Sequence, residues 1–461
     1  MALYGTLNKK LFQRILVLID LCSFFVCIYL MIVVTGRYAL VDVANFAGFA
    51  LISFLVVANM YLWGTYSWVV PSFSWSFKRR ILFANFSILI SWAILSLFAR
   101  DLSSEFLESR VLAFPIWGFG VISYFVRAAF FVKLKSVLKR NNFLVVGSLV
   151  VCQNFHRDVK EMGFEENFFY IINSENIKDM NAIPNCLGLL ADLTKYIDRD
   201  RWAGVIVSLN SESLKSLSNI LMEYKFSGLQ LYTVSDYYEM NWLRLPLYIL
   251  DKSWFAFSSG FVICHNNFWL RYKRIIDVFC SVLLFILTWP ILLLFSLAIA
   301  IESKGGVIYK QQRIGMNGVE FTLYKLRTMY LGAESQAGGL WTAVGDKRIT
   351  RVGKIARKLR VDEFPQLWNI FRGDMSLVGP RPEAVGLVRL YEKEIPFYNT
   401  RHLVKPGVTG WAQVMFGYGS SVEDSIDKLE YDLYYIKNYS FALDLNIFVK
   451  TLRVILGRKG I

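Results

Sequence analysis

The sequence predicts a membrane protein made of three consecutive parts, and two observations support this fold class. Of the 461 residues, 55% are hydrophobic and only 19% are charged, whereas a soluble globular chain is typically ~25% charged. Long apolar runs come first, short apolar segments then alternate with helical stretches, and the last part is polar and basic. We expect a transmembrane bundle over residues 1–140, an α/β domain over 141–265 and a mostly α-helical domain over 266–461.

Four apolar runs in the first part are each close to the ~20 residues that a helix needs to cross a bilayer. Basic residues lie before the first run, between the second and third, and after the fourth, whereas the other two loops carry fewer cations. The positive-inside rule therefore places both ends of this four-helix bundle in the cytoplasm. The runs cover Ile15–Thr35, Val43–Trp63, Ile81–Ala99 and Val111–Val132.

Two charged residues, Asp20 and Arg127, fall within or near these runs. Ionisable side chains inside a membrane are costly, so each has either a functional role or a packing role, and the sequence leaves both open. The net charge of +15 also has two interpretations. Because the basic residues flank apolar runs, we expect them to face anionic membrane lipids and expect no nucleic acid partner.

The middle part has the pattern of a parallel sheet with crossover helices. A dinucleotide-binding turn after its first strand would need three spaced glycines, but the turn at Gly147 has only one. We therefore expect a degenerate Rossmann-like domain with a structural or regulatory role. The expected strands are Phe143–Val151, Phe168–Ile172, Cys186–Leu190, Ala203–Leu209 and Leu229–Val234.

A fifth apolar run, Val278–Ile301, is long enough to cross the membrane. Pro290 lies in its middle, where it removes a backbone hydrogen bond and bends a helix. Both flanks are basic, and basic flanks favour the same side of the membrane. We expect a re-entrant helix that enters the cytoplasmic leaflet, bends and returns; an ordinary fifth span is the alternative.

The last part carries the residues that suit chemistry. Asp362 and Glu363 are adjacent carboxylates that follow a dense basic run ending at Arg360. Asp362 is either a plain N-cap of a helix that Gly373 ends, or a functional group at a helix N-terminus, where amide donors favour phosphate. In the functional interpretation, one carboxylate faces a phosphorus atom and the other faces Mg²⁺.

An apolar stripe precedes the carboxylates at helical spacing and either rests on lipid or packs internally. Further cations crowd the same part near turns and suit phosphate contacts, and Arg381 between two prolines is held on a stiff backbone. The stripe comprises Ile349, Val352, Ile355, Ala356 and Leu359. The cations include Arg313, Lys325, Arg327, Arg381, Arg401 and Lys405.

From about residue 272 to the end, the sequence closely resembles the bacterial polyprenyl-phosphate sugar-1-phosphate transferases. The first two parts resemble the large form of that family, with a membrane bundle and a Rossmann-like domain. The motifs that carry the resemblance are Lys273-Arg274-x-x-Asp277, the proline-broken helix, Gln312 with Gly315, Lys325-x-Arg327, Asp362-Glu363-x-Pro365-Gln366-Leu367-x-Asn369, Gly373 to Pro382, and Lys405-Pro406-Gly407-x-Thr409-Gly410.

This resemblance implies a monotopic catalytic domain at the cytoplasmic face of the bacterial inner membrane. It implies that Asp362 attacks the sugar-bearing phosphate of a UDP-sugar, that UMP leaves, and that undecaprenyl phosphate then takes the phosphosugar. Glu363 would bind Mg²⁺, and the large relatives suggest a homodimer. The expected phosphate contacts are Arg360 and Arg381, with Lys325, Arg327, Arg313 and Lys273 as further candidates.

Two other classes of function compete with this one. A non-catalytic membrane scaffold for polysaccharide assembly has no need of the Asp362–Glu363 pair or of its basic surroundings. A nucleotide-sensing regulator would act through the middle domain, which lacks the glycines of a phosphate loop.

Overall fold

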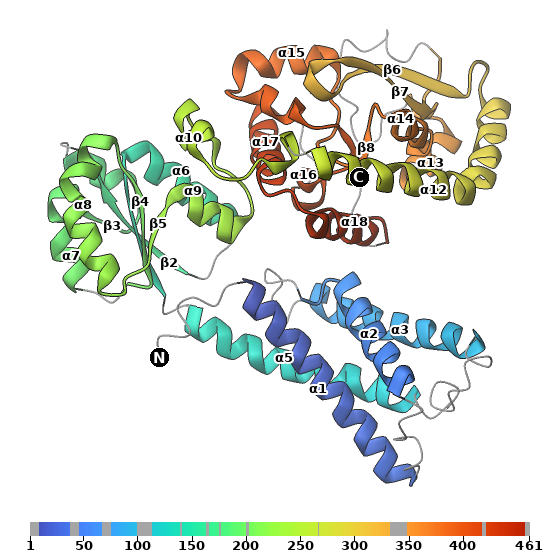
Figure 1. Ribbon diagram of the computed structural model, residues 1–461, viewed down its shortest axis with the longest axis horizontal. Coiled ribbons are helices and arrows are strands. Elements are labelled where there is room, and N and C mark those ends of the chain that lie inside the picture. Colours follow the sequence, from blue (N-terminus) through green and yellow to red (C-terminus); the bar gives the residue numbers. More distant parts are fainter. Residues whose placement is uncertain are drawn as a thin grey trace. The chain divides into compact units, whose positions relative to one another are not determined.

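The chain forms two compact units, residues 1–237 and residues 238–461, in a computed structural model (Figure 1). Each unit is described by itself. The structure describes residues 9–36, 46–66, 75–98, 113–138, 141–162, 166–174, 177–199, 202–265, 267–331, 348–416 and 421–456.

Among the described residues, four helices form the bundle, and each overlaps one predicted apolar run. Two of them, α1 and α5, contain segments long and apolar enough to cross a membrane, whereas the apolar segments of α2 and α3 are shorter. The four helices are thus confirmed, but four crossings remain a prediction. The two cation-poor loops of the orientation argument lie largely outside the described residues. The helices are α1 Lys9–Thr35, α2 Phe46–Leu62, α3 Trp75–Phe98 and α5 Ala113–Leu138.

A buried charge pair crosses the bundle from α1 to α5. Asp20 and Arg127 are both fully buried and form an ion pair. Ser123 and Tyr66 each donate a hydrogen bond to Asp20, at 2.9 and 2.8 Å, and Arg127 also donates to the Thr65 carbonyl at 2.6 Å. Since each charged group has several partners within the bundle, the geometry supports the packing role.

The α/β domain is a five-stranded parallel sheet with strand order β3-β2-β1-β4-β5. All five predicted strands are present. The strands are β1 Asn142–Gly147, β2 Asn167–Ile172, β3 Cys186–Leu189, β4 Gly204–Ser208 and β5 Leu231–Thr233. The helices are α6 Leu149–Met162, α7 Leu193–Arg199, α8 Ser211–Phe226 and α9 Val234–Tyr237, with 3-10 turns at Ile177–Ala182 and Leu190–Asp192.

Helices cover both faces of this sheet (Figure 1). Leu144 packs with residues of α7 and α8, whereas Phe143 contacts Tyr237 of α9. The first strand is shorter than predicted: it ends at Gly147, and the apolar residues up to Val151 begin α6 instead. Apolar residues that follow a strand directly have the composition of a longer strand, so the pattern alone did not mark this boundary.

The second unit begins at Tyr238, so residues 238–265, which we assigned to the α/β domain, pack elsewhere. Leu245 and Leu250 share a core with Leu387 and Leu433 of this unit. The short segments of this stretch are a π-helix Tyr238–Trp242, a 3-10 turn Leu247–Ile249, α10 Lys252–Phe257 and α11 Val262–His265.

The rest of the second unit combines the long helix α12 and several shorter helices with two small sheets in its described residues. β6 and β7 form an antiparallel hairpin, and β8 and β9 pair in parallel. The elements are α12 Asn267–Glu302, β6 Ile308–Ile314, β7 Glu320–Leu326, α13 Arg351–Leu359, α14 Gln366–Arg372, β8 Ser376–Val378, α15 Val385–Glu394, β9 Gly407–Thr409, α16 Trp411–Met415, α17 Val422–Lys437 and α18 Phe441–Leu456, with 3-10 turns at Met316–Gly318, Val361–Glu363 and Tyr398–Leu403.

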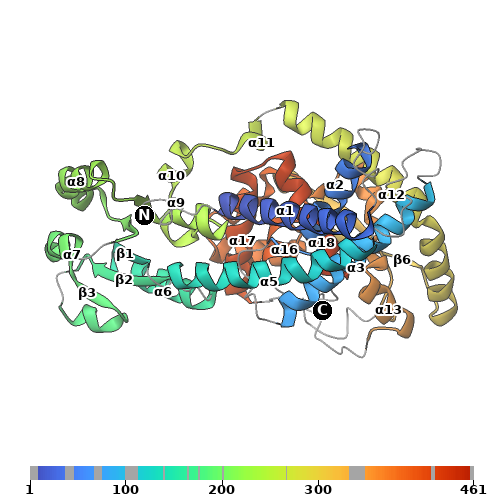
Figure 2. The same ribbon diagram turned by 90° about the horizontal axis from the view of Figure 1, so that it is seen from below.

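The predicted fifth apolar run lies within α12, which contains Pro290 and changes direction along its length (Figures 1 and 2). Both ends of α12 are held by the same unit. Arg274 near its start donates to the carbonyls of Ile370 and Phe371 in α14, and Ile299 near its end packs on Leu326 and Val361. Most apolar side chains between these ends are exposed, as expected of a helix segment that lies in lipid.

Candidate active site

The two carboxylates lie in a tight turn between α13 and α14. Thr350 caps the start of α13 by accepting from the Gly353 amide, and Arg360 ends the helix in the left-handed conformation, with φ at 58°. A side chain other than glycine rarely adopts this φ, and such strain is concentrated at functional sites. Arg360 thus turns the chain sharply, and the 3-10 turn Val361–Glu363 follows at once.

This arrangement corrects one expectation. Asp362 is not the N-cap of the following helix: α14 begins four residues later, at Gln366, with Pro365 at the cap position. Gly373 ends α14 with φ at 97°, as predicted. The carboxylates therefore precede α14 in a separate 3-10 turn, and Asp362 neither caps α14 nor lies in its first turn.

The apolar stripe on α13 divides between two environments. Ala356 is fully buried and Val352 packs against the core formed by Ile299. Ile355 and Leu359 are each more than half exposed. Internal packing therefore uses one part of the stripe and leaves the other part on the surface, where contact with lipid stays a prediction.

Asp362 is buried but incompletely hydrogen-bonded. The residue is 9% exposed, and its Oδ1 atom has no hydrogen-bond partner among the described residues. Burial and the neighbouring Glu363 raise the pKa of Asp362, and the cations Lys325, Arg357 and Arg360 counteract part of that rise. A buried carboxylate oxygen without a partner is costly and marks a candidate for chemistry.

Glu363 has the opposite environment. Its Oε1 atom lies 3.7 Å from Lys325 Nζ, 3.6 Å from an Arg360 nitrogen and 3.7 Å from an Arg381 nitrogen. Burial alone would raise the pKa of Glu363, but these three cations outweigh it and lower the pKa. The two adjacent carboxylates thus have pKa values shifted in opposite directions, as in sites where two carboxyl groups take different roles.

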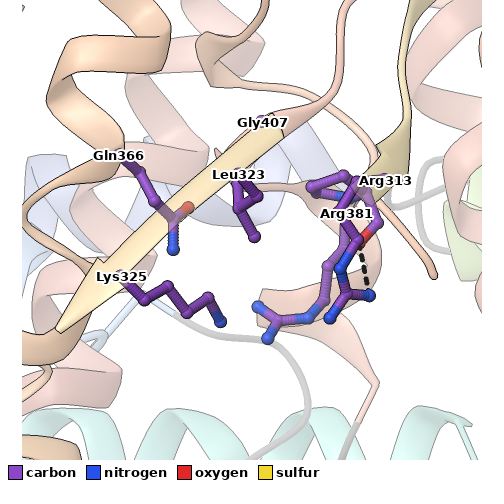
Figure 3. Close-up of a pocket in the computed structure, with 7 residues that line it drawn as sticks. Arg313, Leu323, Lys325, Gln366, Arg381 and Gly407 are labelled. Atoms are coloured by element: carbon purple, nitrogen blue, oxygen red, sulfur yellow. Dashed lines mark hydrogen bonds between the residues drawn. The ribbon is translucent and has the colours of Figure 1, made fainter. Parts of the chain in front are cut away.

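Two of the cations that face Glu363, Lys325 and Arg381, line a small pocket (Figure 3). Its seven lining residues include three cations and no carboxylate: Arg313, Leu323, Lys325, Gln366, Arg381, Pro382 and Gly407. In Figure 3 the charged ends of Lys325 and Arg381 point into the same space, and the Gln366 amide faces it from α14. A pocket of this composition suits a polyanion such as a diphosphate.

Burial and like charge depress the pKa of two of these cations. Burial lowers the pKa of Lys325 to about 8, although Glu363 opposes the change. Burial also lowers the pKa of Arg313 to about 10, and the nearby Arg381 adds to this effect. An incoming anion would relieve this crowding of positive charge, so the site is electrostatically prepared for a negative ligand.

Two predicted phosphate-binding residues lie elsewhere. The guanidinium of Arg327 donates to the carbonyls of Ser303 and Lys304 just after α12, so it caps that helix. Lys273 forms a 2.6 Å ion pair with Asp444 of α18. Neither residue lines the pocket. The sequence shows that both residues are cations within a family motif. It does not show which oxygen atoms the folded chain brings within their reach.

Sequence reasoning did not single out Gln366 and Asn369, although both belong to the quoted motif. Gln366 is buried and lines the pocket. Asn369 is fully buried; it accepts from the Tyr324 amide at 3.1 Å and donates to the Thr322 carbonyl at 2.7 Å. These bonds join α14 to the strand that carries Lys325. The sequence did contain a signal for Gln366 and Asn369, because an amide side chain inside an apolar helix usually has a specific hydrogen-bond partner.

The carboxylate oxygens at this site can form a coordination shell for Mg²⁺ only together with oxygen atoms of a bound substrate. In the part of the chain that the structure describes, no group of three His, Cys, Asp or Glu side chains could hold a metal ion. Mg²⁺ usually takes one or two protein carboxylates and completes its shell with phosphate oxygens and water. Glu363 can supply that carboxylate contribution, and a bound diphosphate can supply the rest.

Comparison with known proteins decides the family. A family model described as bacterial sugar transferase matches residues 268–458. An uncharacterized sugar transferase of Haemophilus influenzae is 30% identical over 410 residues, which cover 83% of this chain and 82% of that relative. This chain belongs to the bacterial sugar transferase family. The resemblance seen in the motifs is thereby confirmed.

Other sugar transferases align with a shorter part of the chain. A protein of Aeromonas hydrophila named UDP-N-acetylgalactosamine-undecaprenyl-phosphate N-acetylgalactosaminephosphotransferase is 47% identical over 188 residues, 41% of this chain and 44% of its own length. A Xanthomonas campestris protein named UDP-glucose:undecaprenyl-phosphate glucose-1-phosphate transferase is 31% identical over 276 residues, 59% of this chain and 57% of its own length. This chain thus spans about half the length of these two sugar transferases.

Proposed function

We propose that this sugar transferase moves a sugar-1-phosphate from a UDP-sugar to undecaprenyl phosphate and releases UMP. The product would start the repeat unit of an exopolysaccharide or O-antigen. The relatives' names support this class of donor and acceptor. The observation that carries the proposal is the buried Asp362 Oδ1 atom, which has no hydrogen-bond partner among the described residues. The adjacent residue Glu363 faces Lys325 and Arg381, two of the three cations that line the pocket.

The first step forms a covalent intermediate. A carboxylate oxygen of Asp362 attacks the phosphorus that bears the sugar, and a new oxygen–phosphorus bond forms. The bond from that phosphorus to the bridging oxygen breaks, and UMP leaves with the electron pair. Arg381, Lys325 and Arg313 would hold the diphosphate oxygens, so their charges stabilise the negative charge that develops on the leaving phosphate.

The second step regenerates the carboxylate. A phosphate oxygen of undecaprenyl phosphate attacks the same phosphorus, the bond to Asp362 breaks, and the lipid-linked diphosphate sugar leaves. Dividing one transfer into two displacements lets the soluble nucleotide and the lipid use one site in turn. Asp362 suits the role of nucleophile because no hydrogen-bond donor among the described residues contacts its buried Oδ1 atom.

Glu363 would be the protein ligand for Mg²⁺. The ion would supply charge neutralisation at the diphosphate. In the structure Glu363 faces three cations, Lys325, Arg360 and Arg381. A bound diphosphate offers these cations new partners, which frees the Glu363 carboxylate for the metal.

The features of α12 support a placement of the site at a membrane surface. A straight helix of its 36 residues would be ~54 Å long. One small unit holds both ends of α12, and the basic flanks favour one side of the bilayer. We propose that α12 is re-entrant from the cytoplasmic face, where UDP-sugars and the phosphate of undecaprenyl phosphate can meet.

The test is UMP release by the purified full-length protein with Mg²⁺, undecaprenyl phosphate and a panel of UDP-sugars. The Asp362→Asn variant is the probe. Asp251→Asn is the matched control, because Asp251 is an exposed N-cap of α10 and asparagine caps equally well. Release with one sugar that Asp362→Asn abolishes and the control retains supports the proposal. Silence of the folded protein across the panel would favour another donor first, and a scaffold next.

The same assay without undecaprenyl phosphate tests for the covalent intermediate. With a UDP-sugar but no undecaprenyl phosphate, one equivalent of UMP per active site should appear rapidly, and the sugar label should stay with the protein. If UMP forms only when the lipid is present, the two substrates react directly and Asp362 is not the nucleophile.

A further inference from the structure

The segment Pro380–Pro382 is held by an unusual set of hydrogen bonds. Its three consecutive carbonyls each accept from a different part of the second unit. They accept, in order, from the Gly407 amide at 2.8 Å, from Arg401 Nη2 at 3.1 Å and from Arg313 Nη1 at 3.2 Å. The middle residue, Arg381, carries the guanidinium that points into the pocket (Figure 3).

Glycines fix the same segment from its other side. A Cβ atom on Gly407 would lie 2.1 Å from the Gly379 nitrogen, and one on Gly410 would lie 2.2 Å from the Gly379 carbonyl oxygen. The Gly379 amide donates to Thr409 at 2.8 Å across the parallel β8–β9 pair. Backbone packed this closely has little freedom to move. The direction of Arg381 therefore depends on the orientation of the chain after Pro380.

Arg401 provides that orientation from a buried position outside the pocket. It is 5% exposed and donates to the Tyr398 hydroxyl at 2.6 Å. Its Nη2 atom, which contacts the Arg381 carbonyl, also lies 2.9 Å from Asp432 of α17, whose side chain is 1% exposed. Burial favours the neutral form of Arg401, but Tyr398 and Asp432 outweigh it and raise the pKa, so the guanidinium stays charged.

Stability alone does not explain a buried ion pair at this place. Burying two charges costs so much that well-packed apolar residues are often equally stable or better. An apolar side chain could fill the volume of Arg401, but it could not donate to the Arg381 carbonyl. The planar guanidinium can donate hydrogen bonds to a carboxylate and a carbonyl at the same time. The single ammonium of lysine cannot do so with the same geometry.

We infer that Arg401 is a positioning residue: paired with Asp432, it holds the Arg381 backbone so that the Arg381 guanidinium faces the diphosphate pocket. This inference rests on the proposed function in so far as the pocket binds the diphosphate of a nucleotide. Arg401 touches no reacting group. Its effect on the ligand passes through Arg381.

The second unit offers a matched control. Arg244 is as deeply buried as Arg401 and forms ion pairs with Asp427 at 3.0 Å and Glu430 at 3.2 Å. Both of these carboxylates lie on α17, the helix that also carries Asp432. Replacing Arg244 therefore disturbs a comparable buried pair on the same helix without removing the Arg401 contact.

The experiment is a double-mutant cycle on full-length protein in lipid nanodiscs, with UDP as the binding probe. Arg401→Lys and Arg381→Ala should each raise the Kd for UDP by about tenfold, and the double variant should be no weaker than Arg381→Ala alone. In UMP release, Arg401→Lys should raise KM more than it lowers kcat. Arg244→Lys should leave the Kd and KM within about twofold of wild type.

Hydrogen exchange gives a measurement that needs no ligand. In Arg401→Lys, the amides of the peptide 377–384 should exchange at least about tenfold faster, whereas those of α14 and β7 should not change. Arg244→Lys should not affect this peptide. If Arg401→Lys fails to fold, Asp432→Asn, which keeps the side-chain volume, should show smaller changes in the same direction.

The outcomes separate the two proposals. Additive effects of Arg401→Lys and Arg381→Ala on UDP affinity, or unchanged exchange in the peptide 377–384, overturn the positioning role and leave the transferase standing. Coupled effects in a protein that releases no UMP support the positioning role and remove the proposed function. If UDP does not bind to the wild type, the exchange rates alone decide the positioning role.

Discussion

Asp20 in the membrane bundle and Asp362 in the candidate active site are both buried aspartates, but their environments differ. Both oxygens of Asp20 accept hydrogen bonds: Oδ1 from Ser123 and Arg127, and Oδ2 from Tyr66 and Arg127. Asp362 has cations nearby, yet its Oδ1 has no hydrogen-bond partner among the described residues.

This difference separates a carboxylate that holds helices together from one that is available for a reaction. Complete pairing offsets the cost of burying Asp20 and makes that residue unreactive. Incomplete pairing does not fully offset the free-energy cost of burying Asp362. Its Oδ1 atom is therefore available to form a bond with the phosphorus atom of a ligand. A buried charge is therefore a candidate for catalysis only after its partners have been counted.

The largest effect should follow from Asp362→Asn. UMP release should fall at least about a thousandfold, because the amide is not a nucleophile. The free energy of unfolding should stay equal or increase, since the variant removes a buried charge whose pKa is raised. Thermal unfolding and the release assay measure the two effects on one preparation. A marked loss of stability would assign Asp362 the structural role of Asp20.

The converse is expected of Asp20→Asn. This variant leaves Arg127 charged and buried in the bundle, which should cost about 3 kcal/mol of stability. UMP release per folded molecule should be unchanged, because the pocket residues lie in the second unit. Protease resistance of the bundle and thermal unfolding in detergent measure the loss. The double variant Asp20→Asn with Arg127→Gln should recover part of it, and equal stability of wild type and single variant would contradict the packing role.

Binding of UDP should weaken with rising pH. Because burial lowers the pKa of Lys325 to about 8, this side chain loses its charge as the pH rises through that value. The Kd for UDP should therefore increase by up to about tenfold between pH 7 and pH 9. Lys325→Arg should flatten the profile, since arginine keeps its proton. A wild-type profile as flat as that of the variant would exclude Lys325 from the phosphate contacts.

The lowered pKa of Lys325 also makes the free energy of unfolding depend on pH. Between pH 8 and the ordinary Lys pKa of 10.5, the unfolded chain binds more protons at this residue than the folded chain does. The contribution of Lys325 to the free energy of unfolding thus increases with pH across that window. Stability and UDP affinity should change in opposite directions there, which distinguishes Lys325 from a residue that only stabilises the fold.

The smallest effect concerns Arg327, which was predicted to bind phosphate and instead caps α12. Arg327→Met should lower the free energy of unfolding by about 1–2 kcal/mol through the lost cap. KM for the UDP-sugar should stay within about twofold of wild type. Thermal unfolding and UMP release measure both quantities, and a large increase in KM with unchanged stability would restore the original assignment.

The sequence by itself was sufficient wherever local composition decides the structure. The apolar runs predicted the four bundle helices, since length and hydrophobicity determine which segments suit a bilayer. Strand-length apolar segments predicted the parallel sheet of the α/β domain. The motifs around Asp362 predicted the family, because they keep the same residues at the same spacing.

Only the tertiary structure decided which cations share the pocket. Lys325 and Arg327 are two residues apart on one segment, yet Lys325 faces Glu363 and Arg327 faces the end of α12. Local sequence cannot distinguish them, because a cation binds whichever oxygen the fold brings within reach. The role of Arg401 has the same origin: it depends on Arg381 and Asp432, which lie 20 and 31 positions away along the chain.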